Sequence, residues 1–170
     1  LPVPEANQGD TLYVWYAVEQ NGSVMYVNQV GTYTADSGNT VTFDVGHLSR
    51  YDLLTTEQPG GTVVASITKN GTTTYYTSLT GEDGAIANAV AGDTIVMSQD
   101  ITNIKNDETL GTTTGIIVID KSITLDGNGH TLAVADNFEN STNIINVVNS
   151  GEVTIKNLTI TGSSNATSAS

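Results

Sequence analysis

The chain has 170 residues, no cysteine and a formal net charge of −13, because five Lys and Arg face eighteen Asp and Glu. This length fits one ordinary domain or two small ones, and the lack of cysteine excludes disulfides and thiolate metal sites. So negative a chain repels the phosphates of nucleic acids and anionic lipid surfaces. We expect neither as a partner.

Hydrophobic runs are short, and the longest, residues 116–119, falls far below the length of a membrane span. We therefore expect no membrane insertion. The chain does not open on a signal-peptide pattern, and we infer that any export signal has been removed or lies outside this segment. Abundant Thr, Asn, Gly and Ser with few Lys and Arg favour a secreted or cell-surface, bacterial protein.

Residues 1–10 contain two prolines and few hydrophobic side chains, which indicates a leader or linker. Two β-hairpins are predicted after them, one turning at Asn21-Gly22 and the other at Asn70-Gly71. Each dipeptide stands between β-branched and aromatic runs. Both residues of Asn-Gly tolerate the positive φ that a type I′ turn needs.

Further strands are expected at residues 31–35 and 40–45, the second because apolar and polar residues alternate there as in a half-buried strand. The Pro-Gly-Gly stretch at residues 57–61 then breaks the pattern. We predict a small antiparallel β-domain, complete or partial, over residues 11–60. A β-hairpin connector follows over residues 61–77.

Within this domain, residues 41–54 (VTFDVGHLSRYDLL) resemble the closing segment of small β-domains in secreted bacterial surface proteins. The residues that carry the resemblance are His47, Leu48, Ser49 and Tyr51. The match is short and covers only the first third of the chain.

Three aromatic side chains of the first region, Trp15, Tyr16 and Tyr26, are candidates for contact with a glycan. Aromatic rings stack on sugars, but they also fill half-buried sheets. Because side chains alternate along a strand, one set is expected in the core and the other at the surface.

A short amphipathic helix is predicted over residues 82–91. Thr80 and Asp83 have the spacing of a capping box, and Gly92 suits a C-terminal cap. Ile86, Ala89 and Val90 would form its apolar stripe.

A repeat follows the predicted helix. Residues 93–102 align without a gap on residues 115–124, which places Ile95 on Ile117 at an offset of 22 residues. A third copy at 143–155 places Ile145 under Ile117. Short strands of this kind cannot bury an apolar face alone, whereas stacked copies can. We therefore predict a parallel β-helix solenoid whose first coil is covered by the helix.

Three segments that follow the predicted helix carry a resemblance to a known family: Ala-Gly-Asp-Thr-Ile-Val (91–96), Lys-Ser-Ile-Thr-Leu-Asp-Gly-Asn-Gly-His-Thr-Leu (121–132) and Val-Thr-Ile-Lys-Asn-Leu-Thr-Ile (153–160). They resemble the N-terminal cap and first coils of pectate-lyase-like right-handed parallel β-helix proteins. The resemblance covers residues 78–162 and implies that fold, with about three coils. It implies no single activity, because the scaffold serves polysaccharide lyases, glycoside hydrolases, adhesins and binding proteins.

Asp126-Gly127-Asn128-Gly129 interrupts an alternating apolar run. Two interpretations are open for this stretch. The favoured one is a backbone corner, in which the glycines adopt left-handed conformations and Asp126 bonds a turn amide. The other is a calcium site at Asp126 and Asn128, although the spacing lacks the further ligands of a calcium loop.

No catalytic site is predicted in this segment. In the repeat alignment no two carboxylates among Asp93, Asp100, Asp120 and Asp126 share a column, whereas glycoside hydrolysis needs a pair. His47 and His130 lie too far apart to suggest a shared metal site. Thr-x-Thr at 40–42, 112–114 and 159–161 would suit an ice-binding array, but these threonines share no column.

The all-β chain is therefore expected to be a noncatalytic part of an exported bacterial cell-surface protein, an adhesin or carbohydrate-binding scaffold with no cofactor. The alternative is the N-terminal part of a polysaccharide lyase or glycoside hydrolase whose active site lies beyond this segment. Residues 163–170 are expected to be a flexible tail. The last coil is expected to be continued by further sequence or covered by a partner.

Overall fold

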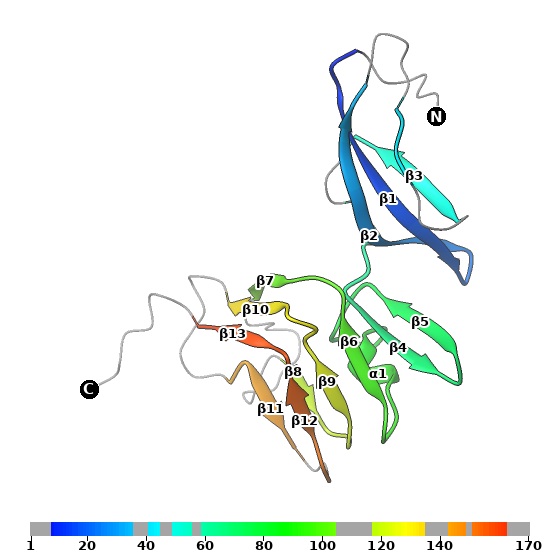
Figure 1. Cartoon of the computed structure of the whole chain (residues 1–170). Coiled ribbons are helices and arrows are strands. Elements are labelled where there is room, and N and C mark those ends of the chain that lie inside the picture. Colours follow the sequence, from blue (N-terminus) through cyan, green and yellow to red (C-terminus); the bar gives the residue numbers. More distant parts are fainter. Residues whose placement is uncertain are drawn as a thin grey trace. The chain divides into compact units, whose positions relative to one another are not determined.

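The computed structural model describes residues 8–35, 41–44, 49–55, 59–104, 117–134, 143–148 and 151–162. The chain divides into two compact units, residues 1–63 (unit 1) and 64–170 (unit 2). The described elements are strands, apart from one short helix (Figure 1).

Unit 1 is an antiparallel sheet in the order β2-β1-β3, formed by β1 (Thr11–Gln20), β2 (Ser23–Thr34) and β3 (Arg50–Leu54). The first expected hairpin is confirmed, because β1 and β2 pair around Asn21-Gly22, where both residues have positive φ. Beyond the hairpin, the backbone N–H of Val63 donates to the carbonyl of Tyr26, so the chain leaves unit 1 along β2.

The pairing of β1 with β2 shifts register twice, between Val14 and Trp15 and between Tyr16 and Ala17. Both Val14 and Trp15 are buried although they are neighbours. Simple alternation therefore does not describe this strand, because bulges change which side chains face the core.

The prediction of a strand at 40–45 is wrong for the described residues 41–44, because these four residues belong to no strand. Val41 nevertheless packs in a small core with Leu12 and Ala35, against Tyr33, Phe43 and Leu53. The third strand of the sheet is β3, within the segment that carries Ser49 and Tyr51. His47 and Leu48 lie outside the described residues.

Unit 2 begins with the second expected hairpin, also confirmed, between β4 (Ala65–Lys69) and β5 (Thr72–Tyr76). Strand β4 also pairs antiparallel with β6 (Thr94–Met97), placing Ala65 opposite Met97 and Ile67 opposite Ile95. These four side chains are buried. The hairpin thus closes one edge of the strands that follow.

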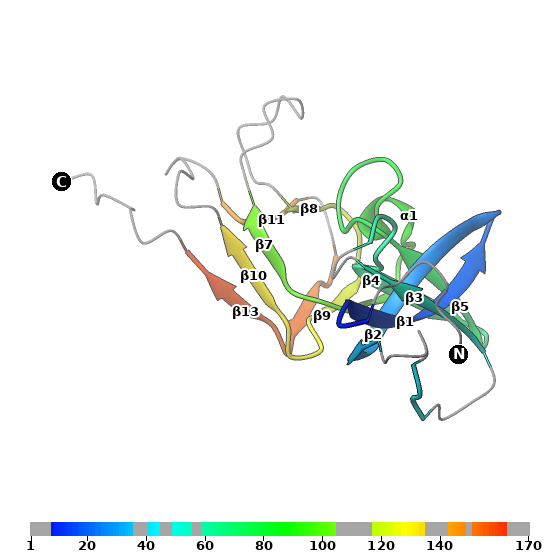
Figure 2. The same ribbon diagram turned by 90° about the horizontal axis from the view of Figure 1, so that it is seen from above.

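The following strands form three parallel stacks (Figures 1 and 2). The first continues from β6 through β9 (Thr124–Asp126) to β12 (Thr154–Lys156). The second contains β7 (Ile101–Ile104), β10 (Thr131–Val134) and β13 (Thr159–Thr161). The third pairs β8 (Ile117–Ile119) with β11 (Ile145–Val147).

The register of the stacks corrects the first part of the repeat alignment. Ile145 pairs with Ile117 as expected, but Ile95 pairs with Leu125 and not with Ile117. Successive partners in this column are therefore 30 residues apart, not 22. The 22-residue alignment compared β6 and β7 with β8 and β9, which are successive strands of neighbouring stacks with the same aliphatic pattern.

The helix is also shorter than predicted. Helix α1 spans only Ala85–Asn88, because Gly84 and Ala89 are both extended and no side chain caps its N-terminus. The expected capping box and the C-terminal cap at Gly92 are therefore wrong. Ile86 and Ala89 are buried as predicted, but Val90 is exposed.

The described residues of unit 2 form one aliphatic core. Its fully buried ladder residues are Ile95, Met97, Ile119, Leu125 and Leu132. Leu79, Ala85, Ile86 and Ala89 join the same cluster, so the segment around α1 packs on the stacked strands.

Candidate functional site

The Asp126–Gly129 stretch forms the corner between β9 and β10, as predicted. Of the two glycines expected to be left-handed, only Gly129 has positive φ, and Asn128 takes the place of Gly127. Asp126 Oδ1 accepts a hydrogen bond from the Asn128 backbone N–H at 2.9 Å. The same oxygen accepts from Asn157 Nδ2 at 3.0 Å, and Lys156 Nζ lies 3.1 Å from Asp126 Oδ2. This corner is thus tied to the next one in the stack.

The two residues considered for calcium have other contacts. Both oxygens of Asp126 accept from donors, and Asn128 Nδ2 donates to the Met97 carbonyl at 3.4 Å. The hydrogen bonds from Asn128 and Asn157, with Lys156 nearby, hold the pKa of Asp126 below its ordinary value. The described residues include no group of three His, Asp or Glu placed to hold a metal ion.

Asp100 performs a similar role at the start of the second stack. Its Oδ1 accepts from the Thr131 backbone N–H at 2.9 Å and lies 3.2 Å from His130 Nδ1. The hydrogen bond from Thr131, then that from His130, lowers the pKa of Asp100. This carboxylate therefore links β7 to β10 and is ionised at neutral pH.

The corrected register creates a polar column that the repeat alignment missed. Thr94, Thr124 and Thr154 occupy successive positions of the first stack. Two residues further along these strands, the column reads Val96, Asp126 and Lys156. Only the first of these two columns consists of threonines. This face therefore lacks the two parallel threonine columns that an ice-binding Thr-x-Thr array needs.

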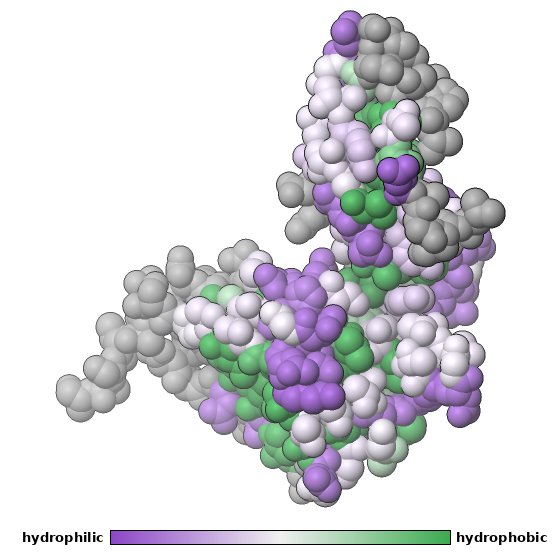
Figure 3. Space-filling view, in the orientation of Figure 1, coloured by the Kyte–Doolittle hydropathy of each residue, from purple (hydrophilic) through white to green (hydrophobic). Residues whose placement is uncertain are grey.

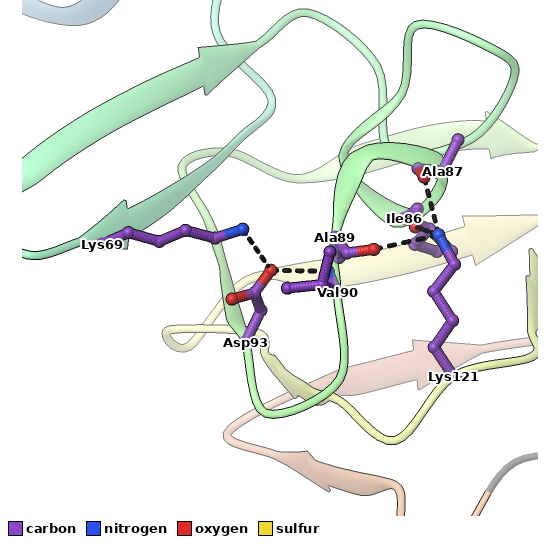
Figure 4. A network of polar contacts seen from close by, with 7 residues as sticks. All are labelled: Lys69, Ile86, Ala87, Ala89, Val90, Asp93 and Lys121. Carbon is purple, nitrogen blue, oxygen red and sulfur yellow. Dashed lines mark hydrogen bonds and ion pairs between the residues drawn. The ribbon is translucent and has the colours of Figure 1, made fainter.

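A second polar network surrounds α1 (Figure 4). Lys121 Nζ donates to three carbonyls at the end of the helix, those of Ile86 (3.1 Å), Ala87 (2.6 Å) and Ala89 (3.0 Å). A cation suits this end because the last carbonyls of a helix are otherwise unpaired. Lys121 precedes β9, so it fastens the helix to the stack.

On the other side of this network, Asp93 Oδ2 accepts from the Val90 backbone N–H at 2.7 Å and lies 2.8 Å from Lys69 Nζ (Figure 4). Burial alone would raise the pKa of Asp93, but Lys69 and the Val90 N–H outweigh it and lower the pKa. The Asp93 side chain therefore connects the hairpin, the turn after α1 and β6.

Replacing Lys121 with Met should destabilise unit 2 by about 1–3 kcal/mol, because three carbonyls lose a charged donor while the aliphatic stem is kept. Urea unfolding followed by far-UV circular dichroism measures the loss. Lys156→Met is the control: it removes one ion pair of a half-exposed lysine, which should cost clearly less because solvent screens an exposed pair. Equal losses in the two variants would contradict the role given to Lys121.

The lowered pKa of Asp93 predicts a pH-dependent contribution to stability. A depressed folded-state pKa means that the contribution is present above the unfolded pKa, about 4, and is lost as the pH falls through the lower folded value. Asp93→Asn should thus be less stable than the parent at pH 7, and the difference should shrink below about pH 4. Urea midpoints across pH test this, with exposed Asp83→Asn as the control. A difference that stays constant with pH would refute it.

The three aromatic candidates lie in unit 1 but do not form one cluster, because Trp15 and Tyr16 are consecutive in the regular pairing of β1 with β3 and contact different rings. Trp15 is only 6% exposed, whereas Tyr16 and Tyr26 are half-buried. The rings of Trp15 and Tyr26 meet edge to face with centroids 6.2 Å apart, and Tyr16 lies against Tyr51 at 6.0 Å. Among the described residues, the buried indole Nε1 of Trp15 has no hydrogen-bond partner.

A polar cluster beside these rings was not identified from the sequence. Arg50 Nε and Nη2 each donate to Asp52 at 2.9 Å, and the Tyr26 hydroxyl also bonds Asp52. Burial, and then the charge of Asp52, raises the pKa of Tyr26. Arg50 and Asp52 lie on β3, a strand that the sequence patterns did not predict, so the cluster could not be assembled from them.

Comparison with known proteins gives one match. The family model described as "Putative pectate lyase-like adhesive domain" matches residues 83–169, just over half of the chain. No curated protein and no solved structure matches the chain significantly. In the part of the chain that the structure describes, no helix has the length and hydrophobicity of a membrane span.

Proposed function

Since this chain belongs to the pectate lyase-like adhesive domain family, we propose that it is a noncatalytic, adhesive part of an exported bacterial cell-surface protein. The observation that carries the proposal is the match itself, which covers the parallel-strand unit from α1 onward. A surface or extracellular location agrees with an adhesive domain.

We further propose that unit 2 is the beginning of a right-handed parallel β-helix. The three parallel stacks support this, because each strand pairs with an equivalent 28 to 31 residues away, as successive turns of a solenoid would. Such a column presents short, regular strands on its outside, which suits an extended contact surface.

Three carboxylates of unit 2 favour a noncatalytic role. A general acid needs a raised pKa, but the pKa values of Asp93, Asp100 and Asp126 are lowered by the hydrogen bonds that hold the strands together. In the described structure these three side chains serve as structural acceptors. Incubation with polygalacturonate and calcium should yield no unsaturated product, and product formation by this chain would overturn the noncatalytic role.

The adhesive ligand that we propose is a glycan on a polysaccharide or cell surface, bound through unit 1. Tyr26 is a half-buried ring, and the Arg50–Asp52 pair beside it offers charged hydrogen-bonding groups. Sugars are recognised by this combination of an aromatic face and planar polar groups. Trp15 contributes by supporting the ring of Tyr26.

A glycan array with the purified chain tests this proposal. The chain should bind a subset of glycans, and Tyr26→Ala should lose that binding, while Tyr26→Phe should keep the ring contact and lose only the hydroxyl. Tyr75→Ala, which removes a tyrosine from unit 2, should bind like the parent. An array without any bound glycan, or binding unaffected by Tyr26→Ala, would refute glycan contact at this site.

A further inference from the structure

Unit 1 carries its charge almost entirely as carboxylates. Residues 1–63 contain one Arg and no Lys against seven Asp and Glu, which gives unit 1 a formal net charge of −6. The single Arg is Arg50, which belongs to the polar cluster of Tyr26, Arg50 and Asp52. Whether this cluster attracts or repels an acidic ligand therefore depends on what holds Arg50.

Strand pairing places the polar cluster on one face of the sheet. Ala17 in β1 lies opposite Tyr26 of β2 and opposite Arg50 of β3. Directly opposed side chains point to the same face, so Tyr26 and Arg50 lie on either side of Ala17. Asp52 is on this face too, since it is two residues from Arg50 along β3. The small, buried side chain of Ala17 leaves room for the Tyr26 hydroxyl to reach Asp52.

The guanidinium group of Arg50 is already paired. Its Nε donates to Asp52 Oδ1 and its Nη2 to Asp52 Oδ2, both at 2.9 Å. This is the bidentate geometry of a strong charge-assisted pair. The hydrogen bonding to Asp52, and then the charge of Asp52, raises the pKa of Arg50. An acidic ligand must therefore displace Asp52 before it gains a cation.

A second carboxylate adds negative charge to the same face. Glu19 is exposed and lies two residues from Ala17 along β1, so its side chain points to the face of the polar cluster. Its charge also acts on Arg50. Where the structure describes this face, one cation thus meets the two carboxylates of Asp52 and Glu19, and the local charge is negative.

The polar cluster nevertheless offers hydrogen bonds to an uncharged ligand. The side chains of Arg50 and Asp52 are 48% and 20% exposed, so solvent reaches both. A guanidinium group has more N–H donors than the two that Arg50 directs to Asp52, and a carboxylate has further lone pairs. Sugar hydroxyls both donate and accept, so they match this mixture. In Figure 3 the described strands of unit 1 present mainly surface of intermediate hydropathy, with smaller hydrophilic and hydrophobic patches.

On the basis of the glycan-binding role proposed above for unit 1, we propose that the glycan recognised at the polar cluster is neutral. The ring of Tyr26 packs on the sugar, and the Arg50–Asp52 pair bonds its hydroxyls. A uronate, sialate or sulfated sugar would bring another negative charge beside Asp52 and Glu19. Like charges brought together in this way weaken binding strongly.

A glycan array of matched pairs tests this selectivity. Polygalacturonate is placed beside its methyl ester, and sialylated oligosaccharides are placed beside the same oligosaccharides without sialic acid. The buffer contains a chelator, because a calcium ion would bridge a uronate to Asp52. Among the pairs that bind, the neutral member should bind at least about tenfold more tightly at low salt, and the preference should shrink as salt screens the charges.

Charge variants separate the polar cluster from the general charge of unit 1. Asp52→Asn removes a negative charge and releases Arg50, so binding of the acidic members should rise by about tenfold or more relative to the neutral ones. Glu19→Gln should act in the same direction without removing the Arg50 pair, which keeps the test decisive if Asp52→Asn fails to fold. Asp44→Asn, the matched control, removes an exposed carboxylate of unit 1 outside the polar cluster and should change the preference little.

Three outcomes contradict the selectivity in distinguishable ways. Equal or tighter binding of the acidic members by the parent chain would overturn it and leave the glycan-binding role intact. An equal shift in Asp44→Asn and Asp52→Asn would also overturn it, because the preference would then belong to the net charge of unit 1. An array without any bound glycan would instead refute the glycan-binding role, and the selectivity with it.

Discussion

Replacing Leu125 with Ala is expected to lower the free energy of unfolding of unit 2 by about 2–5 kcal/mol, the range for deleting a buried leucine side chain. Leu125 is 0% exposed and lies between Ile95 on one side and Ile155 on the other. The cavity would thus open in the middle of a column, where neither neighbour can move without breaking a parallel pairing. Urea unfolding followed by far-UV circular dichroism measures the loss.

The matched control is Ile155→Ala in the same column. Ile155 is already half in water, so its truncation removes less buried surface and should cost clearly less than Leu125→Ala. Fluorescence of Trp15, the single tryptophan, reports on unit 1 and separates its transition from that of unit 2. Equal costs at positions 125 and 155 would contradict the burial order of the column.

Gly127→Ala is the second substitution with a large expected effect. A Cβ atom at Gly127 would lie 2.5 Å from the carbonyl oxygen of Asn157 and 2.7 Å from the Cα of Leu158. Both are backbone atoms of the neighbouring corner, so the strands β12 and β13 must shift to make room. Overpacking of this kind costs about 1–3 kcal/mol. Thermal unfolding should show the loss.

Gly162→Ala provides the control, because a Cβ atom there meets no atom within 4 Å and its φ is not positive. Its stability should equal that of the parent or slightly exceed it, since alanine restricts the unfolded chain. A Gly127→Ala protein as stable as Gly162→Ala would show that the two corners do not pack as closely as described.

Local chemistry made the hairpins and the corner predictable. Asn21-Gly22, Asn70-Gly71 and the Asp126 corner depend on residues that accept positive φ or bond a nearby amide, and these preferences act over a few residues. The pairing of Ile117 with Ile145 was also predictable, because each of these two strands contains one aliphatic run and the two runs align.

The register of β6 was not predictable in the same way. All stacks carry the same alternation of aliphatic and polar residues, so Ile95 matches Ile117 as well as it matches Leu125. Whether Ile95 pairs with Ile117 or with Leu125 depends on how many strands make up one turn of the column. The sequence of a single strand does not determine that number. The helix is shorter than predicted for a local reason: the backbone is extended at both Gly84 and Ala89, so only Ala85–Asn88 is helical.

The sites were less predictable than the fold. Tyr26 was identified by residue type, but its charged neighbours Arg50 and Asp52 lie on a strand that gave no clear pattern. Lys121 and Asp93 gave no signal either. Lys121 reaches carbonyls more than thirty residues away, and such a contact follows from folding rather than from spacing.

Cross-strand nuclear Overhauser effects between backbone protons of an isotope-labelled chain test the stacked column most directly. The structure predicts contacts of Ile95 with Leu125, of Leu125 with Ile155, and of Ile117 with Ile145. Backbone contacts of Ile95 with Ile117, or none between Leu125 and Ile155, would contradict the 30-residue register and the parallel stacks built on it.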